Sequence, residues 1–161
     1  MSKAPPKKGD AVDLLDADHI AVKKMFDQYK KLAESEAPAD QRKQLADQIC
    51  MELTVHTQIE EEIFYPAMRE ASDEEDIMDE ADVEHAGAKD LIAQISAMGA
   101  DESHFDAKVK VLGEMIDHHV TEEREKMFPE ARKSDLDLVA IAEQLQARKT
   151  EVQRELEGTA A

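Results

Sequence analysis

The pattern His-x-x-x-Glu occurs twice in this chain, and in both copies a proline stands six positions after the glutamate. The first copy runs from His56 to Glu60 and the second from His119 to Glu123. Since residues four apart lie on one face of an α-helix, each copy places an imidazole and a carboxylate side by side. Two such helices facing each other would line a cavity with metal-binding side chains.

A second pair of segments also repeats, at nearly the same offset along the chain. Residues 16–19 read Asp-Ala-Asp-His and residues 82–85 read Asp-Val-Glu-His, so His19 and His85 occupy the same place. The chain thus contains two copies of one unit, a helix with Asp-x-x-His followed by a helix with His-x-x-x-Glu. One unit is a helical hairpin that buries half of a core, and two hairpins form a four-helix bundle.

The composition also favours long helices. Glycine and proline are scarce, with five of each, tryptophan is absent, and 42% of the 161 residues are hydrophobic, which is enough for a core. We therefore predict an all-α fold, an antiparallel up-down four-helix bundle with an additional C-terminal helix. Its expected parts are a disordered N-terminal tail over 1–10, the bundle over 11–133, and a C-terminal helix and tail over 134–161.

The apolar spacing predicts where the helices run, and all four repeat histidines fall on the apolar stripes. Pro66 and Pro129 lie inside helical sequence, and each should end or kink its helix near the preceding residue. The expected helices cover 11–32, 40–71, a stretch after the acidic turn 72–76, and a stretch from about 102, with Ser134 as the N-cap of a fifth helix.

The chain carries a net charge of −18, which repels phosphate backbones and anionic lipid headgroups. We therefore expect no nucleic-acid partner and no membrane partner, and no apolar run reaches the ~20 residues that span a bilayer. Residues 1–10 lack the apolar stretch of a signal peptide. Cys50, the one cysteine, reads as a small buried hydrophobe, and the lack of any intrachain disulfide favours a cytoplasmic location.

A single histidine on an apolar stripe is usually an ordinary core residue, but four of them with two glutamates indicate a shared role. Burying an unpaired carboxylate is costly, and cations are few, because Arg124 is expected to point away from Glu123 and Lys126 to lie at the edge of the stripe. A metal ion would relieve this cost for all the groups at once. The predicted metal ligands are His19, His56, Glu60, His85, His119 and Glu123.

Imidazole and carboxylate ligands suit iron, manganese or zinc, and six of them exceed the four of a tetrahedral zinc site. Two metals roughly 3.5–4 Å apart fit better, because carboxylates can bridge them. We predict two iron ions with an oxo or hydroxo bridge from solvent, each with one vacant position for oxygen, peroxide or azide. One metal would take His19 and His56, the other His85 and His119, and Glu60 and Glu123 would bridge.

Three acids near the predicted centre have two interpretations each. Asp16 and Asp82 stand three residues before a ligand histidine. They could accept the second N–H of that histidine, or be acids in a first helical turn that favour the helix dipole. Glu52 lies one turn before His56, either as an extra ligand or, as we favour, as a flanking residue.

The remaining histidines and the tyrosines are expected to lie outside the ligand set. His118 also starts a His-x-x-x-Glu pattern, but only His119 keeps the proline spacing and the apolar line. His104 is expected in an exposed loop. Tyr29 and Tyr65 are expected to pack in the core.

The order of these motifs resembles the hemerythrin-like (HHE cation-binding) domain family over about residues 10–133. The resemblance implies an antiparallel four-helix bundle around a non-haem di-iron centre, with the six residues above as ligands. The oxygen-carrying hemerythrins of invertebrates have a fifth histidine where this chain has Lys89, with Ala81 in the preceding turn. They have a bridging aspartate where this chain has Arg124. The resemblance is therefore to the broader bacterial HHE group.

We expect a non-haem di-iron protein that binds or senses dioxygen, peroxide, nitric oxide or iron. A peroxide-decomposing enzyme at the same centre and a metal-independent helical interaction module are the alternatives, and zinc or manganese could take the place of iron. The sequence identifies no acid–base residue beyond the predicted ligands, and it indicates no particular protein partner or oligomeric state.

Overall fold

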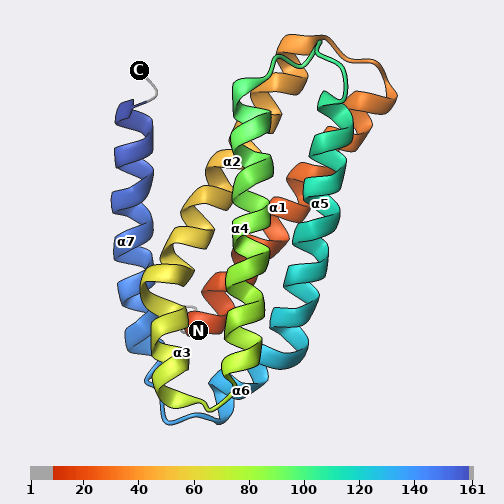
Figure 1. The fold of residues 1–161 in the computed structure, drawn as a ribbon. Coiled ribbons are helices and arrows are strands. Elements are labelled where there is room, and N and C mark those ends of the chain that lie inside the picture. The colour runs from red at the N-terminus through yellow and green to blue at the C-terminus, as the bar shows by residue number, and fades with distance from the viewer. Residues whose placement is uncertain (1–8, 160–161) are drawn as a thin grey trace, which may run out of the picture.

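The computed structural model describes residues 9–159, and all regular secondary structure in that range is helical, as predicted. Residues 1–8 of the predicted N-terminal tail lie outside the described residues. Figure 1 shows the long helices lying side by side. The elements are α1 (Ala11–Glu34), α2 (Ala39–Ile59), the π-helix η1 (Glu60–Phe64), α3 (Tyr65–Ala71), α4 (Glu75–Ala97), α5 (Phe105–Glu122), the π-helix η2 (Glu123–Met127), α6 (Phe128–Lys133) and α7 (Leu138–Thr159).

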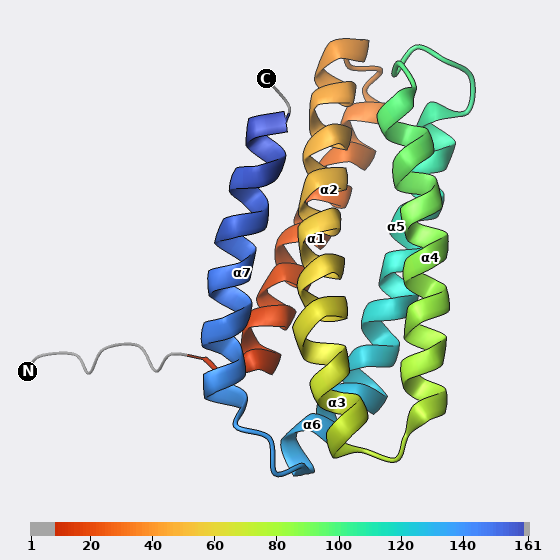
Figure 2. The ribbon, with the colours of Figure 1, turned by 60° about the vertical axis from the view of Figure 1, so that its left-hand side comes forward.

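Four long helices surround the core. Helix α1 packs against α2 and α5, and α4 packs against the same two helices. Helix α7 lies along α1 and α2, on the side away from α4 and α5 (Figure 2). No helix within residues 9–159 is both long and apolar enough to cross a membrane.

The hydrophobic core consists of two separate clusters, and the repeat histidines lie between them along each helix. On α1, Leu15 belongs to one cluster and Val22 to the other, with His19 between them. On α2, on α4, and on α5 continued by η2, the histidine likewise lies between residues of the two clusters, in reversed chain order on α2 and α5. A polar layer therefore crosses the middle of the molecule, with a close-packed apolar cluster on either side of it along the helices.

The N-terminus of α1 is fixed by a capping box, since the carboxyl of Asp10 accepts the N–H of Asp13 and the carboxyl of Asp13 accepts the N–H of Asp10. Arg132 of α6 donates to both acids. Asp10, which the sequence analysis placed in the tail, is thus the N-cap of α1.

Each proline follows a π-helical turn. The prediction was a helix end or a kink, and the helix end is wrong, because the chain continues helically past Pro66 and Pro129. The π-helices start at Glu60 and Glu123, and the N–H groups of Tyr65 and Phe128 donate to the carbonyls of these two glutamates. The wider turn accommodates the ring that follows and lets the chain continue helically as α3 and α6. The repeat in sequence is therefore also a repeat in backbone geometry.

The predicted cap of the last helix is wrong. Ser134 is the C-cap of α6, and its hydroxyl donates to the carbonyl of Ala131 over 2.6 Å. Helix α7 begins at Leu138, after Asp137, whose carboxylate accepts the N–H of Ala140 over 3.0 Å. Serine and aspartate cap helices equally well, so the sequence alone did not discriminate between the two positions.

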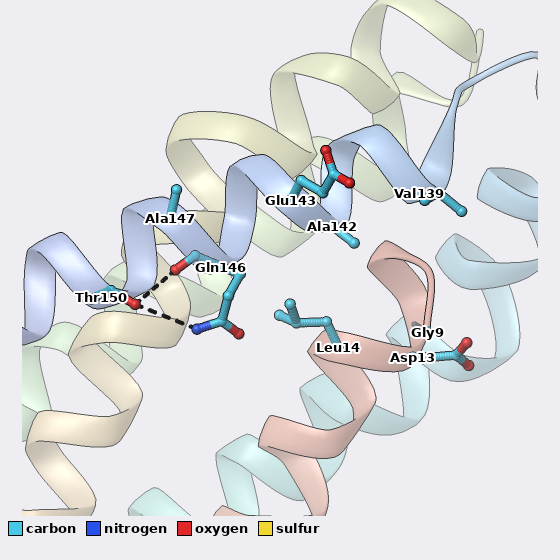
Figure 3. A pocket seen from close by; sticks show the side chains of 9 residues that line it. All are labelled: Gly9, Asp13, Leu14, Val139, Ala142, Glu143, Gln146, Ala147 and Thr150. Atoms are coloured by element: carbon cyan, nitrogen blue, oxygen red, sulfur yellow. Dashed lines mark hydrogen bonds between the residues drawn. The ribbon is translucent and has the colours of Figure 1, made fainter. Parts of the chain in front are cut away.

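A pocket lies between the first turns of α1 and the first half of α7. Figure 3 shows Leu14 of α1 facing Ala142 and Gln146 of α7 across it. None of the six predicted metal ligands lines this pocket, so it is separate from the polar layer.

Candidate metal centre

The six predicted ligands converge in the polar layer, and all six side chains are buried. Their ligand atoms form two groups, in each of which all atoms lie within 4.8 Å of one another. Both groups contain Glu60 and Glu123. The first quartet is His19, His56, Glu60 and Glu123, and the second quartet is Glu60, His85, His119 and Glu123.

The four histidines point their Nε2 atoms at the middle of the layer. The Nε2 atoms of His19 and His56 lie 3.1 Å apart, and those of His85 and His119 also lie 3.1 Å apart. The glutamate oxygens lie among them, and the Nε2 to carboxylate distances are 2.6 Å for His119–Glu123, 3.1 Å for His56–Glu60, 3.3 Å for His85–Glu60 and 3.7 Å for His19–Glu123.

Each of these histidines has a carboxylate on its other ring nitrogen. The Nδ1 to oxygen distances are 3.2 Å for His19–Asp16, 3.0 Å for His56–Asp18, 3.2 Å for His85–Glu61 and 2.8 Å for His119–Glu84. An ionised carboxylate only accepts hydrogen bonds, so Nδ1 carries the hydrogen and Nε2 of the neutral ring presents a lone pair to the centre. This is the tautomer that a metal ion requires.

Only one of these four carboxylates was predicted from the sequence. The contact of Asp16 with His19 agrees with one of its two interpretations. For Asp82 that interpretation is wrong, because its carboxylate pairs with Arg69 over 2.7 Å, and Glu61 of η1 takes the place beside His85.

Asp18 and Glu84 were missed, although a signal was present in the sequence. They are equivalent positions of the repeat, each one residue before a predicted ligand. In the structure each reaches the histidine of the next long helix, Asp18 from α1 to His56 and Glu84 from α4 to His119. A contact between helices depends on how the two helices are rotated, which spacing along one helix does not reveal.

The carboxylate oxygens of Glu60 and Glu123 are the least satisfied polar atoms in the centre. All four are buried, and none has a well-formed hydrogen bond within the described residues. A neutral imidazole does not supply one, since its single N–H bond points outwards to one of the other carboxylates, and only a second proton on the ring would place a donor on Nε2. Unsatisfied buried carboxylates are strongly unfavourable. The imidazole lone pairs and the two carboxylates point at the same space, and the neutral rings place no hydrogen-bond donor there. Such a site suits a cation.

Without a cation, protons stabilise the cluster. Burial disfavours charge on His56, but the Glu60 carboxylate and the contact with Asp18 outweigh burial and raise the pKa of His56 well above its usual value. Burial likewise opposes charge on His119, yet Glu123 and Glu60 raise its pKa to about 9. Burial also opposes ionisation of Glu60, and His56 and His85 nevertheless hold its pKa well below its usual value. A metal ion binding here would displace the imidazole protons.

Tyr65 is a member of the centre as well as a core residue. Its ring stacks on His85 with centroids 5.1 Å apart, and its hydroxyl lies 3.1 Å from Nε2 of both His85 and His119. The repeat equivalent is Phe128, whose ring stacks on His19 with centroids 5.8 Å apart. The two quartets therefore differ, because the tyrosine hydroxyl lies beside the second one.

The other candidate residues lie outside the two quartets. Glu52 belongs to neither of them. His118 is exposed, as is His104, which precedes α5 with a left-handed backbone (φ 71°). Tyr29 is buried and donates its hydroxyl to Asp106 over 2.5 Å.

Cys50 is buried as predicted, and burial raises the pKa of its thiol to about 11. Arg124, which was expected to point away from Glu123, is partly exposed and donates to Asp16 over 2.6 Å.

Comparison with known proteins identifies relatives of this chain. The sequence matches the family of the hemerythrin HHE cation binding domain over residues 10–131. It is 29% identical over 150 residues to a protein named DNA nickase from a Nostoc species (strain PCC 7120). That alignment covers 92% of this chain and 41% of the relative, so the chain spans about two-fifths of that protein.

The fold is similar to the crystal structure of a hemerythrin HHE cation binding domain-containing protein from Mycobacterium kansasii. The TM-score is 0.74 at 24% sequence identity, and the match covers 91% of this chain and 89% of the other.

Proposed function

The chain belongs to the hemerythrin HHE cation-binding family, and from this premise we propose that it is a non-haem di-iron protein that binds or senses dioxygen, peroxide, nitric oxide or iron. One observation carries the proposal: two buried quartets of ligand atoms share both of their carboxylates. Shared carboxylates are what a pair of metal ions requires in order to be bridged.

The proposed ligands follow the quartets. His19 and His56 would hold one iron, His85 and His119 would hold the other, and Glu60 and Glu123, which belong to both quartets, would serve both. When bound, the two irons would supply redox chemistry and could take a small ligand. The chain's own residues orient the imidazoles through the four Nδ1 carboxylates, while the two apolar clusters pack on either side of the layer.

We propose an antiparallel up-down four-helix bundle as the frame of this centre. The short connections between successive helices support it, with four residues between α1 and α2 and three between α3 and α4. Short connections favour antiparallel neighbours. The contacts of α1 and α4 with both α2 and α5 support the same arrangement.

Metal analysis of the full chain tests the proposal. Protein expressed without added metal, or refolded with ferrous ion in air, is expected to hold about two irons, one for each quartet. A near-ultraviolet band that azide perturbs is expected with them. Protein that takes up no iron under these conditions contradicts the proposal, and zinc or manganese in its place corrects the identity of the metal.

Peroxide decomposition is the second candidate, and the position of Tyr65 favours it. Burial, together with the carboxylates of Glu123 and Glu60, raises the pKa of the phenol well above its usual value. The hydroxyl therefore keeps its proton beside the second quartet, where it can donate that proton to a ligand. An acid placed in this way commonly contributes to catalysis.

Tyr65→Phe is expected to lower the peroxide consumption of the iron-loaded protein about tenfold or more, while the iron content stays unchanged. Tyr29→Phe, whose hydroxyl bonds Asp106 at a distance from the centre, is the matched control and should retain its rate. A loaded protein that consumes peroxide no faster than free iron removes this second candidate.

The absence of nucleic-acid and membrane partners and the cytoplasmic location remain predictions. The net charge of −18 favours the absence of nucleic-acid and membrane partners, and the lone buried cysteine favours the cytoplasm. The nickase name belongs to a relative more than twice as long as this chain.

A further inference from the structure

The four carboxylates behind the histidines are themselves paired with basic groups. The oxygen to nitrogen distances are 2.6 Å for Asp16–Arg124, 2.6 Å for Asp18–Lys149, 2.6 Å for Glu61–Lys89 and 3.2 Å for Glu84–His118. The chain has 38 acids and only 20 lysines and arginines, so the acids outnumber these basic residues by 18. All four acids nevertheless have a basic partner, as do some acids elsewhere in the molecule, such as Asp106 with Arg42.

The pair of Asp18 and Lys149 differs from the other three in burial. The side chains of Asp18 and Lys149 are 11% and 19% exposed, whereas those of Arg124, Lys89 and His118 are 46%, 52% and 63% exposed. Exposed ion pairs contribute little because water and salt screen them. Of the four ion pairs, the one between Asp18 and Lys149 is therefore the least screened by solvent.

The two oxygens of Asp18 divide their contacts. Oδ2 accepts from Nδ1 of His56 over 3.0 Å, and Oδ1 accepts from Nζ of Lys149 over 2.6 Å. The carboxylate is thus held from both sides, and turning it towards solvent would break both bonds. Asp18 therefore connects Lys149 to His56 by two successive hydrogen bonds.

Lys149 comes from α7, which lies beyond the segment matched by the family at residues 10–131. The helix is docked on the bundle by buried Ile141 and Leu145, which belong to the same apolar cluster as residues of α1 and η1. A second ion pair joins Arg148 to Glu62 of η1 over 2.6 Å. The helix that supplies Lys149 is therefore fixed relative to the first quartet.

We propose that Lys149 is a positioning residue through which helix α7 controls the first quartet, by holding Asp18 against His56. This inference rests on the proposed function, since it needs a metal at that quartet. Groups that orient a ligand histidine commonly change metal affinity by about 10- to 100-fold when they are removed. Removing the positive charge of Lys149 would by itself raise the affinity for a cation. That charge is separated from the metal by Asp18 and the imidazole of His56, so we expect the loss of positioning to have the larger effect and the affinity to fall.

Titration of the full-length, metal-free chain with Co²⁺ in competition with a chelator tests the proposal. The unmodified chain is expected to bind two equivalents. Lys149→Met should weaken one of them about tenfold and leave the other within about twofold, because only the first quartet contains His56. Lys149→Arg, which keeps the bond to Asp18, should restore the affinity, and Lys149→Gln should recover part of it.

Arg148→Gln is the matched control, since it removes the neighbouring cation of α7 and its pair with Glu62 but leaves Asp18 untouched. Both Co²⁺ equivalents should remain as in the unmodified chain, even if the melting temperature falls. In a His19→Ala chain, whose first quartet is incomplete, Lys149→Met should change the remaining equivalent by less than about twofold.

The outcomes separate the two proposals. An unmodified chain that binds no Co²⁺ overturns the proposed centre and this inference with it. If both Co²⁺ affinities of Lys149→Met equal those of the unmodified chain, or are tighter, the role of Lys149 is overturned while the proposed centre stands. Equal weakening of both equivalents in Lys149→Met and Arg148→Gln would show that α7 acts only through general stability, and this also overturns it.

Discussion

Glu60→Gln is expected to remove tight binding of both metal ions at once. Glu60 is shared by the two quartets, and its two carboxylate oxygens are buried without a well-formed hydrogen bond. An amide keeps the shape of the side chain but loses the negative charge that offsets the metal charge on both sides. Both equivalents should weaken by more than about 100-fold, beyond what loss of an orienting group costs.

Glu52→Gln is the control for this experiment. It makes the same change of charge one turn before His56, outside both quartets, and should leave both affinities within about twofold. His85→Ala provides a second comparison, because His85 belongs to one quartet only and its loss should affect mainly one equivalent. A Glu60→Gln chain that retains one equivalent at full affinity would show that Glu60 does not bridge. Titration with Co²⁺ measures the two affinities, and circular dichroism of the metal-free proteins checks that each variant keeps its helical fold.

Removal of the metal is expected to cost the fold much of its stability. A ligand that binds only the native state adds about 4 kcal/mol at a concentration about 1,000 times its Kd. For a domain of this size 1 kcal/mol corresponds to about 2–4 °C, so chelation should lower the melting temperature by about 10 °C or more. The physical cause is the pair of buried glutamates, which lose the charge that compensates them.

Thermal unfolding of the iron-loaded protein with and without a chelator measures this loss. Glu60→Gln, which is not expected to hold metal, should show the same melting temperature in both conditions. An unmodified chain whose melting temperature ignores the chelator would instead favour a metal-independent helical module, in which the histidines only fill the core.

The choice of the six converging side chains was possible from sequence because it depends on geometry within single helices. His56 and Glu60 share a face whatever lies opposite, since four residues make about one helical turn. The internal repeat then placed two such units in one chain, and in the structure the six side chains do meet. That they bind iron is what the metal analysis and the Glu60→Gln experiment decide.

The backbone around the prolines was not predictable in the same way. Pro66 and Pro129 indicated a helix end or a kink, but a π-helical turn also accommodates a proline, and only the packing of α3 and α6 decides between these solutions. Ser134 and Asp137 posed a similar choice between two good capping residues. In both cases the local alternatives differ by little in free energy, and contacts with distant parts of the chain settle them.

The sequence by itself determined the helical fold, the two-unit repeat and the side chains that line its middle, because these follow from spacing along one helix. Only the tertiary structure decided that Asp18 and Glu61 reach histidines on other helices, that the Tyr65 hydroxyl enters the centre, and that Lys149 stands behind Asp18. Such contacts depend on the rotation and axial offset of one helix against another. Those are set by how whole faces pack, and no single stretch of sequence encodes them.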